Sequence, residues 1–278
     1  MRPRCRLALL AFLACGWLST ATAGFAASVA EIKARGKLVM LCFPHQESDF
    51  IRIKVEAGLD HYDGIDFDLM SGFAKMLGVT LEVRPVKPDF GALLPALLAG
   101  EGDVIASEFS VTAERERQVS FSTPYFGVHN VVVVSGTSSA RGASDLAGKK
   151  ASTIAGSSNL ELTKALKPGV VAFANFTRWS FDAVSEGKAD FTVQDEPSVW
   201  RLLKHYPDLK VAFALPGVEY YGYAVGRGGD LKSALDNYLV DLRKSGELAA
   251  ILRRYLGEQA GAAVDSLPAL PAASPGGR

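Results

Sequence analysis

Residues 109–126 read FSVTAERERQVSFSTPYF, and the rest of the chain is organised around this stretch. Two hydroxyl residues, Ser110 and Thr112, stand where a short helix is expected to begin, and Arg115 follows three residues after the second. A guanidinium beside hydroxyls and the free amides of a helix start can bind a small carboxylate, because its planar fork makes two parallel hydrogen bonds. The stretch therefore predicts an anion-binding site around Arg115. Arg117 points elsewhere on any helix and is expected to be solvated.

Short strands and amphipathic helices alternate on both sides of this stretch. Before it, we expect strands at 38–43, 79–83 and 103–106 and helices at 64–77 and 93–98. After it, we expect strands at 131–134, 151–154, 170–173, 191–193 and 223–226, and helices at 160–166, 181–186, 197–205, 231–242 and 248–256. The apolar residues recur at helical or strand spacing in these segments. The alternation predicts an α/β fold with parallel strands covered by helices.

The first 23 residues have the pattern of a secretory signal peptide. A basic start at residues 2–6 precedes an apolar run at 7–18 and the small residues Ala21-Thr22-Ala23. The apolar run is too short to span a bilayer, so we expect export to the periplasm with cleavage near Ala23. The alternative is a lipid anchor at Cys15, but the apolar run continues past that residue.

Charge and cysteine content narrow the class of protein further. Loss of the leader removes three arginines and no acid, so 30 Lys plus Arg become 27 against 30 Asp plus Glu, a net charge near −3. Such a balance does not favour a nucleic-acid partner. Cys42 is the one cysteine that follows the leader, which excludes an internal disulfide; it is expected to be a buried thiol or else to line a pocket. Residues 258–278 end in a run rich in Pro, Ala, Gly and Ser and are expected to form a disordered tail.

Over about residues 37–257 the chain resembles the family 3 periplasmic solute-binding proteins, the polar amino-acid receptors of ABC importers. Besides 109–126, the resemblance rests on the order and spacing of GIDFDL at 64–69, LPALLAGEGD at 94–103, DLAGKK at 145–150, GKAD at 187–190 and VQDE at 193–196. It implies a type II periplasmic-binding-protein fold, with two α/β lobes joined by a two-segment hinge. Lobe 1 is expected to comprise 37–126 plus 222–257, and lobe 2 to comprise 127–221.

The resemblance also implies that a ligand carboxylate is held between the lobes. Arg115 and Ser110 match the positions that bind it from lobe 1, and the backbone amides at Ser157 and Ser158 can bind it from lobe 2. These hydroxyl residues also suit plain helix caps, and Thr112 is expected to be mainly a cap.

Two further positions match ligand contacts of the family. Asp195 matches the carboxylate that binds the ligand ammonium, although an aspartate at a strand end is often only a turn or cap residue. Phe90 matches an aromatic residue that covers the ligand, although a phenylalanine also suits a position in the core. The aromatic residues Tyr220, Tyr221 and Tyr223 near the expected hinge belong to the core or line the cleft, and sequence does not choose between these.

The chain departs from the family pattern at two places. Family members usually carry an aspartate just after the first strand, where this chain has LCFPHQE at 41–47, so a second ammonium contact is missing or supplied by another residue such as Glu47. Glu108 occupies a position that is normally small. A carboxylate there would repel an anionic ligand by about 4 kcal/mol for unit charges about 4 Å apart at an effective dielectric of about 20. Glu108 therefore turns away, is protonated or pairs with Arg115, or else the ligand is not an ordinary α-amino acid.

The expected function is capture of a small amino acid or related carboxylate and its delivery to an inner-membrane ABC permease, by a monomer without cofactor or metal. Two alternatives remain on the same fold. One is a partner protein of a quinoprotein dehydrogenase, which the missing aspartate permits. The other is an enzyme resembling cyclohexadienyl dehydratases, in which Glu108 and Asp195 would form a carboxylate pair for proton transfer.

Overall fold

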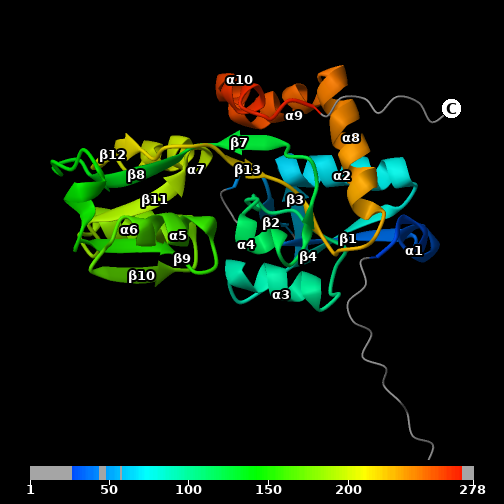
Figure 1. The fold of residues 1–278 in the computed structure, drawn as a ribbon, viewed down its shortest axis with the longest axis horizontal. Coiled ribbons are helices and arrows are strands. Elements are labelled where there is room, and N and C mark those ends of the chain that lie inside the picture. The colour runs from blue at the N-terminus through cyan, green and yellow to red at the C-terminus, as the bar shows by residue number, and fades with distance from the viewer. Residues whose placement is uncertain (1–26, 44–47, 57, 271–278) are drawn as a thin grey trace, which may run out of the picture.

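The computed structural model describes residues 27–43, 48–56 and 58–270, which form two lobes, each built on a five-stranded sheet (Figure 1). Strand and helix alternate along most of the chain. The predicted α/β fold with two lobes is confirmed. Among these residues, no helix combines the length and the apolar content needed to cross a membrane. The expected signal peptide lies outside the described residues.

The sheet of lobe 1 has the strand order β4-β1-β5-β14-β6. Its strands are β1 (Lys37–Cys42), β4 (Thr80–Pro85), β5 (Val104–Ile105), β6 (Ser120–Phe121) and β14 (Ala224–Val225). β1 pairs in parallel with β4 and β5, whereas β14 is antiparallel to β5 and β6. The chain therefore returns after lobe 2 to add β14 to the first sheet.

The sheet of lobe 2 has the strand order β10-β9-β11-β8-β12. Its strands are β8 (Asn130–Ser135), β9 (Lys150–Ile154), β10 (Val170–Ala174), β11 (Phe191–Asp195) and β12 (Leu209–Ala214). β9 and β11 run in parallel, so their carboxyl ends meet at one edge of the sheet. Ile154, at the end of β9, packs into an apolar cluster of lobe 1 with Phe90 and Leu93, and this edge therefore faces lobe 1.

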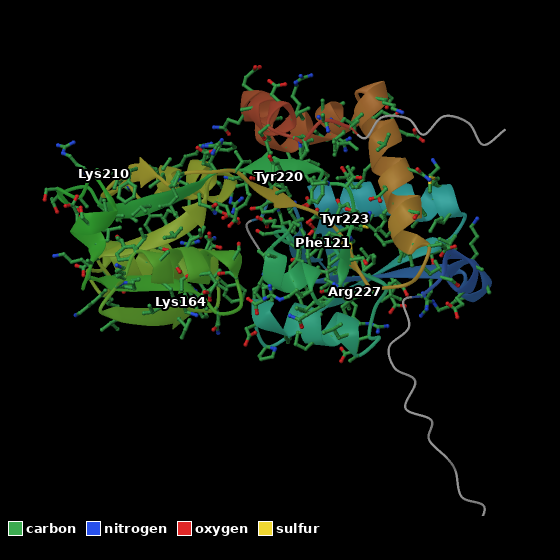
Figure 2. All side chains as sticks on the ribbon, in the orientation of Figure 1. Phe121, Lys164, Lys210, Tyr220, Tyr223 and Arg227 are labelled. Atoms are coloured by element: carbon green, nitrogen blue, oxygen red, sulfur yellow. The ribbon has the colours of Figure 1, made fainter. Side chains whose placement is uncertain are left out.

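Two antiparallel strands cross between the lobes side by side. β7 (Phe126–Val128) leaves lobe 1, and β13 (Glu219–Tyr221) returns to it. In Figure 2, Tyr220 lies in this crossing, Lys164 and Lys210 lie on lobe 2, and Phe121 and Arg227 lie on lobe 1. The paired strands form the two-segment hinge.

The helices cover the sheets and extend over the hinge. They are α1 (Val29–Arg35), α2 (Ile65–Leu77), α3 (Leu93–Leu98), α4 (Ala113–Glu116), α5 (Ser158–Ala165), α6 (Thr177–Ser185), α7 (Glu196–Leu202), α8 (Leu231–Ser245), α9 (Glu247–Leu256) and α10 (Ala260–Asp265), with 3-10 turns η1 (Phe90–Ala92), η2 (Ala143–Leu146), η3 (Leu203–His205) and η4 (Gly257–Gln259). In α2, Leu69, Phe73 and Leu77 recur every four residues and are buried, so one face of the helix packs on the core. Before it, Gly64 has φ 123°, and a Cβ there would lie 2.4 Å from the carbonyl oxygen of Phe50, so only glycine fits.

The C-terminal segment corrects a sequence prediction. Disorder was expected from 258 on, but residues 260–265 form α10, which packs over β7 (Figure 1). Ala263 and Leu267 are buried there, and the Tyr220 hydroxyl donates to the Ser266 carbonyl at 3.2 Å. The alanine- and glycine-rich composition resembles that of a linker, but small residues also allow close packing on the hinge. Residues 271–278 lie outside the described part.

The hairpin β2 (Arg52–Glu56) and β3 (Leu59–Asp63) was not expected from the sequence. β2 alternates polar and apolar residues, but burial does not alternate along either strand, and Val55 and Leu59 are exposed, so neither strand packs one face on the core. The hairpin lies on lobe 1 beside the cleft between the lobes, where it lines a cavity described below.

Candidate functional site

Arg115 lies between the two lobes. Thr112 caps α4 by accepting from the Arg115 amide at 3.2 Å, which holds the arginine at the start of its short helix. The guanidinium donates to the Ser110 carbonyl at 2.7 Å within lobe 1 and to the Gly156 carbonyl at 3.0 Å in lobe 2. It also lies 3.8 Å from the centre of the Phe109 ring. Burial lowers the pKa of Arg115 to about 10, so the group remains a cation at neutral pH.

The predicted hydroxyl groups meet across the cleft. The Ser158 hydroxyl of lobe 2 donates to the Ser110 hydroxyl of lobe 1 at 3.0 Å. Ser157 occupies the N-cap position of α5, but its hydroxyl donates to the Ile154 carbonyl at 2.8 Å and makes no capping bond. The Ser157 amide donates to the Ile154 carbonyl at 3.3 Å and is therefore not available to a ligand, contrary to the prediction for this residue. Ser158 and Asn159, the next two residues of α5, line the same cavity as Arg115, where helix-start amides can bind a carboxylate.

Asp195 ends β11 and is surrounded by three donors. Its Oδ1 accepts from Asn130 Nδ2 at 2.7 Å and from Asn159 Nδ2 at 2.9 Å. The hydroxyl of Tyr221, in the returning hinge strand, donates to its Oδ2. Burial raises the pKa of Asp195, and the three donors oppose that rise. The carboxylate thus joins lobe 2 to the hinge.

These partners of Asp195 escaped sequence analysis. Asn130 is the first residue of β8, Asn159 lies in α5, and no motif marks them; only the parallel and antiparallel pairing of β8, β9 and β11 brings them together. The sequence left open whether the tyrosines near the hinge belong to the core or to the site. Tyr221 belongs to both, because it is fully buried and its hydroxyl bonds to Asp195.

Glu108 is held in place by two hydrogen bonds in lobe 1. Its φ is 52°, in the left-handed region that non-glycine residues rarely adopt. Its amide donates to Asp66 Oδ2 at 2.9 Å, and Asp66 in turn accepts from the buried hydroxyls of Tyr125 and Tyr223. The Ser48 hydroxyl donates to Glu108 Oε1.

Of the alternatives that the sequence left open for Glu108, the structure favours a protonated side chain near the cavity. Burial raises the pKa of Glu108 to about 8, while Ser48 and the Arg201 charge oppose the rise and Asp66 and Asp195 add to it. Arg115 is not its partner, because that guanidinium bonds to two carbonyl groups. A group that is mainly neutral at pH 7 does not repel a carboxylate ligand as strongly as an ionised one would.

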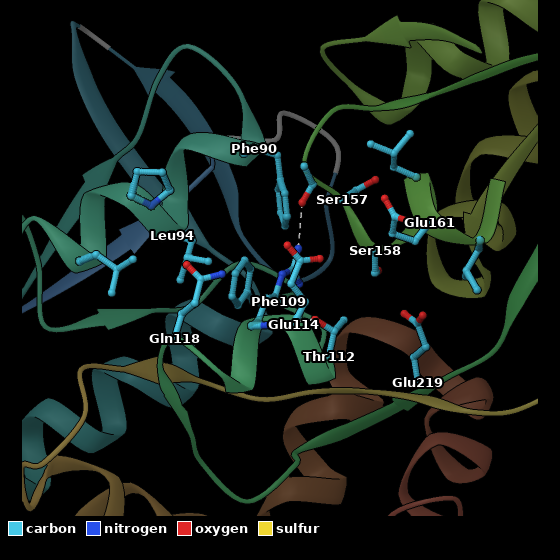
Figure 3. Close-up of a pocket in the computed structure, with 17 residues that line it drawn as sticks. Phe90, Leu94, Phe109, Thr112, Glu114, Gln118, Ser157, Ser158, Glu161 and Glu219 are labelled. Atoms are coloured by element: carbon cyan, nitrogen blue, oxygen red, sulfur yellow. Dashed lines mark hydrogen bonds between the residues drawn. The ribbon is translucent and has the colours of Figure 1, made fainter. Parts of the chain in front are cut away.

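A third carboxyl group, Glu219, was missed by sequence analysis. It lies in β13 and lines the cleft with Arg115 (Figure 3). Its Oε2 is buried and has no hydrogen-bond partner among the described residues. Burial, and then the nearby Asp195, raise the pKa of Glu219. The hinge strand thus contributes an acid to the site, which a motif search in the lobes does not find.

All seven predicted site residues line one small cavity of about 50 Å³ between the lobes: Phe90, Glu108, Ser110, Arg115, Ser157, Ser158 and Asp195. Phe90 is 8% exposed, and its ring lies 5.8 Å from the Arg115 guanidinium. A larger cavity of about 590 Å³ adjoins on the side of α3, α4 and α5 (Figure 3). Another of about 840 Å³ adjoins on the side of the β2–β3 hairpin, α6 and α7.

The lobes are closed on this cavity. Arg201 of lobe 2 forms an ion pair with Asp49 of lobe 1 at 2.9 Å, and the Phe43 ring of lobe 1 stacks on Phe176 of lobe 2 at 5.6 Å. A Cβ on Gly156 would lie 2.4 Å from the Cα of Gly91 in the other lobe, so this approach requires glycine.

The sequence left open the roles of Cys42 and Glu47. Cys42 is fully buried in the core of lobe 1, and burial raises the pKa of its thiol to about 12, so it is a core thiol and lines none of the three cavities. Glu47, the suggested second ammonium contact, lies outside the described residues. Within the described part of the chain, no cluster of His, Cys, Asp and Glu has the arrangement of a metal site.

The sequence model of one protein family, the bacterial extracellular solute-binding proteins, family 3, matches residues 48–258. The chain belongs to this family. The arginine-binding protein ArgBP of T. maritima, solved as its P235GK mutant, is similar with 30% identity and a TM-score of 0.74, covering 83% of this chain and 99% of that one. The amino-acid ABC transporter substrate-binding protein AbpA of Streptococcus pneumoniae, bound to L-arginine, is 29% identical with a TM-score of 0.72, covering 83% and 97%.

Curated relatives include proteins of two kinds. A membrane-bound lytic murein transglycosylase F of Desulfosudis oleivorans is 27% identical over 82% of this chain and 50% of its own length. The chain thus spans about half the length of such relatives. A probable histidine-binding protein of Neisseria gonorrhoeae is 29% identical over 72% of this chain and 77% of its own length.

Proposed function

We propose that this family 3 protein captures an α-amino acid between its lobes in the periplasm and delivers it to an ABC permease of the inner membrane. The observation that carries the proposal is the convergence of an arginine, a helix start and a carboxylate on one cavity, from both lobes. These are the groups that a zwitterion needs.

In the proposed complex, Arg115 and the amides at the start of α5 bind the ligand carboxylate, and Asp195 binds its ammonium group. The guanidinium now bonds to two backbone carbonyls, and a carboxylate would replace one of these weaker bonds with a charge-assisted one. Because Ser110 and Ser158 belong to different lobes, a ligand that contacts both favours the closed arrangement. In this proposal, the permease recognises the closed arrangement of the lobes.

The charge of the site favours a ligand with more donors than acceptors. Asp195 in the cavity and Glu219 at its mouth lie near Arg115, the single cation among the lining residues, while Glu108 is largely neutral. Structural relatives bound to L-arginine and a curated relative named as histidine-binding support a polar amino acid over a dicarboxylate.

The test is a thermal unfolding screen of the purified protein against the twenty amino acids, with Arg115→Ala and Arg117→Ala alongside. A ligand at a hundredfold excess over its dissociation constant adds about 2.7 kcal/mol, a shift of a few degrees for a protein of this size. We expect one or a few amino acids to shift the wild type and the exposed Arg117 variant, and none to shift the Arg115 variant. If no amino acid shifts the wild type, the proposal fails, and copurification with a periplasmic dehydrogenase would then support a partner protein.

A second candidate is a dehydratase-like enzyme, which the raised pKa of Glu108 favours. An acid with a pKa of about 8, next to Asp195, holds a proton at neutral pH that it can transfer. The ancestral amino-acid-binding protein AncCDT-1, named as a precursor of cyclohexadienyl dehydratase, is a structural neighbour at 25% identity and a TM-score of 0.72. Turnover of prephenate or arogenate that Glu108→Gln abolishes, with binding retained, would support this candidate. Absence of turnover in the folded protein would remove it.

A further inference from the structure

Helix α10 lies beyond the part of the chain that the family model matches. That match ends at residue 258, and α10 spans Ala260–Asp265. Ala260 and Ala263 are buried, and they belong to one apolar cluster with the buried leucines of α9 in lobe 1. After the helix, Arg243 of α8 donates to the Pro268 carbonyl at 2.5 Å. The helix is therefore anchored on lobe 1.

The end of α10 contacts the middle of the hinge. Gly127 of β7 and Tyr220 of β13 lie opposite each other in the paired strands, and both meet Ser266, the residue that follows the helix. The Tyr220 hydroxyl donates to the Ser266 carbonyl at 3.2 Å. A Cβ on Gly127 would overlap the Ser266 hydroxyl oxygen, so this close approach requires glycine.

The hinge strand under α10 also carries two residues of the cleft. Side chains alternate along a strand, so Tyr220 points to one side of β13 and Glu219 and Tyr221 point to the other. Glu219 lines the 590 Å³ cavity, and the Tyr221 hydroxyl donates to Asp195 of lobe 2. A shift of β13 against α10 would therefore move both side chains in the cleft.

Opening of the lobes has to change the geometry of the hinge. Hinge motions are absorbed by a few residues that change φ and ψ, and here the two paired strands connect the lobes. The contacts at Ser266 are made while the lobes are closed through the ion pair of Arg201 with Asp49. A helix that is anchored on lobe 1 and packed on the central pair of the hinge opposes such changes.

We propose that α10 braces the hinge in its closed geometry and thereby slows release of the captured ligand, with Gly127 and Tyr220 as positioning residues. The effect on release rests on the proposed function, because it needs a ligand in the cleft, whereas the effect on the lobes does not. A ligand leaves through the open state, so a brace that lowers the open population slows its release.

Distances between the lobes test the brace without a ligand. Nitroxide labels on Lys75→Cys in α2 and Lys188→Cys in lobe 2, both exposed positions, report these distances by pulsed electron paramagnetic resonance. The labelled chain starts at Gly24, so Cys42 is its one native cysteine, and that thiol is fully buried.

Gly127→Ala is the variant that should release the brace. The new methyl group takes the place of the Ser266 hydroxyl and should lift the end of α10 from the hinge. The φ of Gly127 is not left-handed, so alanine is otherwise compatible with the strand. We expect the ratio of closed to open lobes to fall about tenfold, which corresponds to the loss of one hydrogen bond and the apolar contact around it.

A second substitution separates the helix contact from the backbone of the hinge. Ser266→Gly removes both side-chain atoms that the new methyl group would meet, so Gly127→Ala combined with Ser266→Gly should restore most of the closed population. Tyr220→Phe keeps the ring but loses the bond to the Ser266 carbonyl, and should lower the ratio about threefold. Gly261→Ala is the matched control, because a Cβ there meets no atom of the described residues within 4 Å on the exposed side of α10.

Stopped-flow fluorescence measures the effect on release. The probes are L-arginine, L-histidine and L-glutamine, which the names of relatives mention. We expect the bound probe to dissociate about tenfold faster from Gly127→Ala, with nearly unchanged association, and to dissociate normally from the double variant. A variant that only destabilised the fold would lower the melting temperature without changing the dissociation rate.

The results separate the brace from the proposed function. Unchanged lobe distances in Gly127→Ala, or no recovery on addition of Ser266→Gly, would overturn the brace whether or not an amino acid binds. Equal dissociation rates in all variants would overturn its effect on release. If no amino acid of the unfolding screen binds the wild type, the proposed function fails, and the label distances still decide the brace. Should Gly127→Ala not fold, Tyr220→Phe carries the same test.

Discussion

Replacement of Glu108 by glutamine should remove most of the fall in stability that we expect between pH 5 and pH 8. The folded protein keeps the Glu108 proton up to a pKa of about 8, against an ordinary value of 4.5. The unfolded chain releases it near its ordinary pKa, so between these values the folded state binds more protons and stability falls as the pH rises.

The magnitude follows from the shift. One pKa unit corresponds to about 1.4 kcal/mol, so the Glu108 carboxyl lowers the free energy of unfolding by up to about 3 kcal/mol between pH 5 and pH 8. The side chain borders two cavities, and solvent there will reduce this figure. Glutamine preserves an acceptor for the Ser48 hydroxyl but does not titrate. The free energy of unfolding of the variant should therefore lack this part of its decrease with pH.

The assay is urea unfolding of both proteins without ligand at pH 5, 6, 7 and 8. Burial raises the pKa of Asp66 to about 6, so Asp66 also makes the stability of both proteins fall as the pH rises. The difference between the two pH profiles therefore reports Glu108. Glu101→Gln, on the exposed turn after α3, controls for the loss of one acid. Parallel pH profiles for wild type and Glu108→Gln would refute the reasoning.

Three other changes test the site and the hinge. Arg115→Met should lose the bonds to both lobes and abolish amino-acid binding in calorimetry, whereas Arg117→Met, on the exposed face, should bind as the wild type; equal loss in both would contradict the clamp. Asp195→Asn should raise the dissociation constant of the amino-acid ligand by about a hundredfold, since a buried charge loses its partner, and an unchanged constant would assign the ammonium elsewhere. A chain ending at Gln259 should unfold about 5 °C or more below a chain ending at Leu270, because α10 buries apolar side chains against the hinge; equal melting temperatures would show that α10 contributes nothing.

Much of the site was readable from local sequence. Arg115, Ser110 and Thr112 lie within six residues, and their roles follow from one short helix and its cap. The strand-end position of Asp195 follows from the VQDE segment after an apolar run. These predictions need only local geometry, which the chain encodes over a few residues.

Other site residues could not be predicted in this way. Asn130, Asn159 and Tyr221 reach Asp195 from a strand, a helix and a hinge segment far apart in sequence. Arg201 and Asp49 are 152 residues apart and form an ion pair only because the lobes close. No periodicity or motif of one segment contains information about such partners.

The sequence by itself determined the alternation of strands and helices, and with it the class of the fold, because each buried face is written as a local spacing of apolar residues. The tertiary structure alone decided how Glu108 behaves. Its pKa depends on burial between two lobes, on a serine 60 residues away and on an arginine of the other lobe. Solvent exclusion and charge proximity are properties of the folded arrangement, and no single segment carries them.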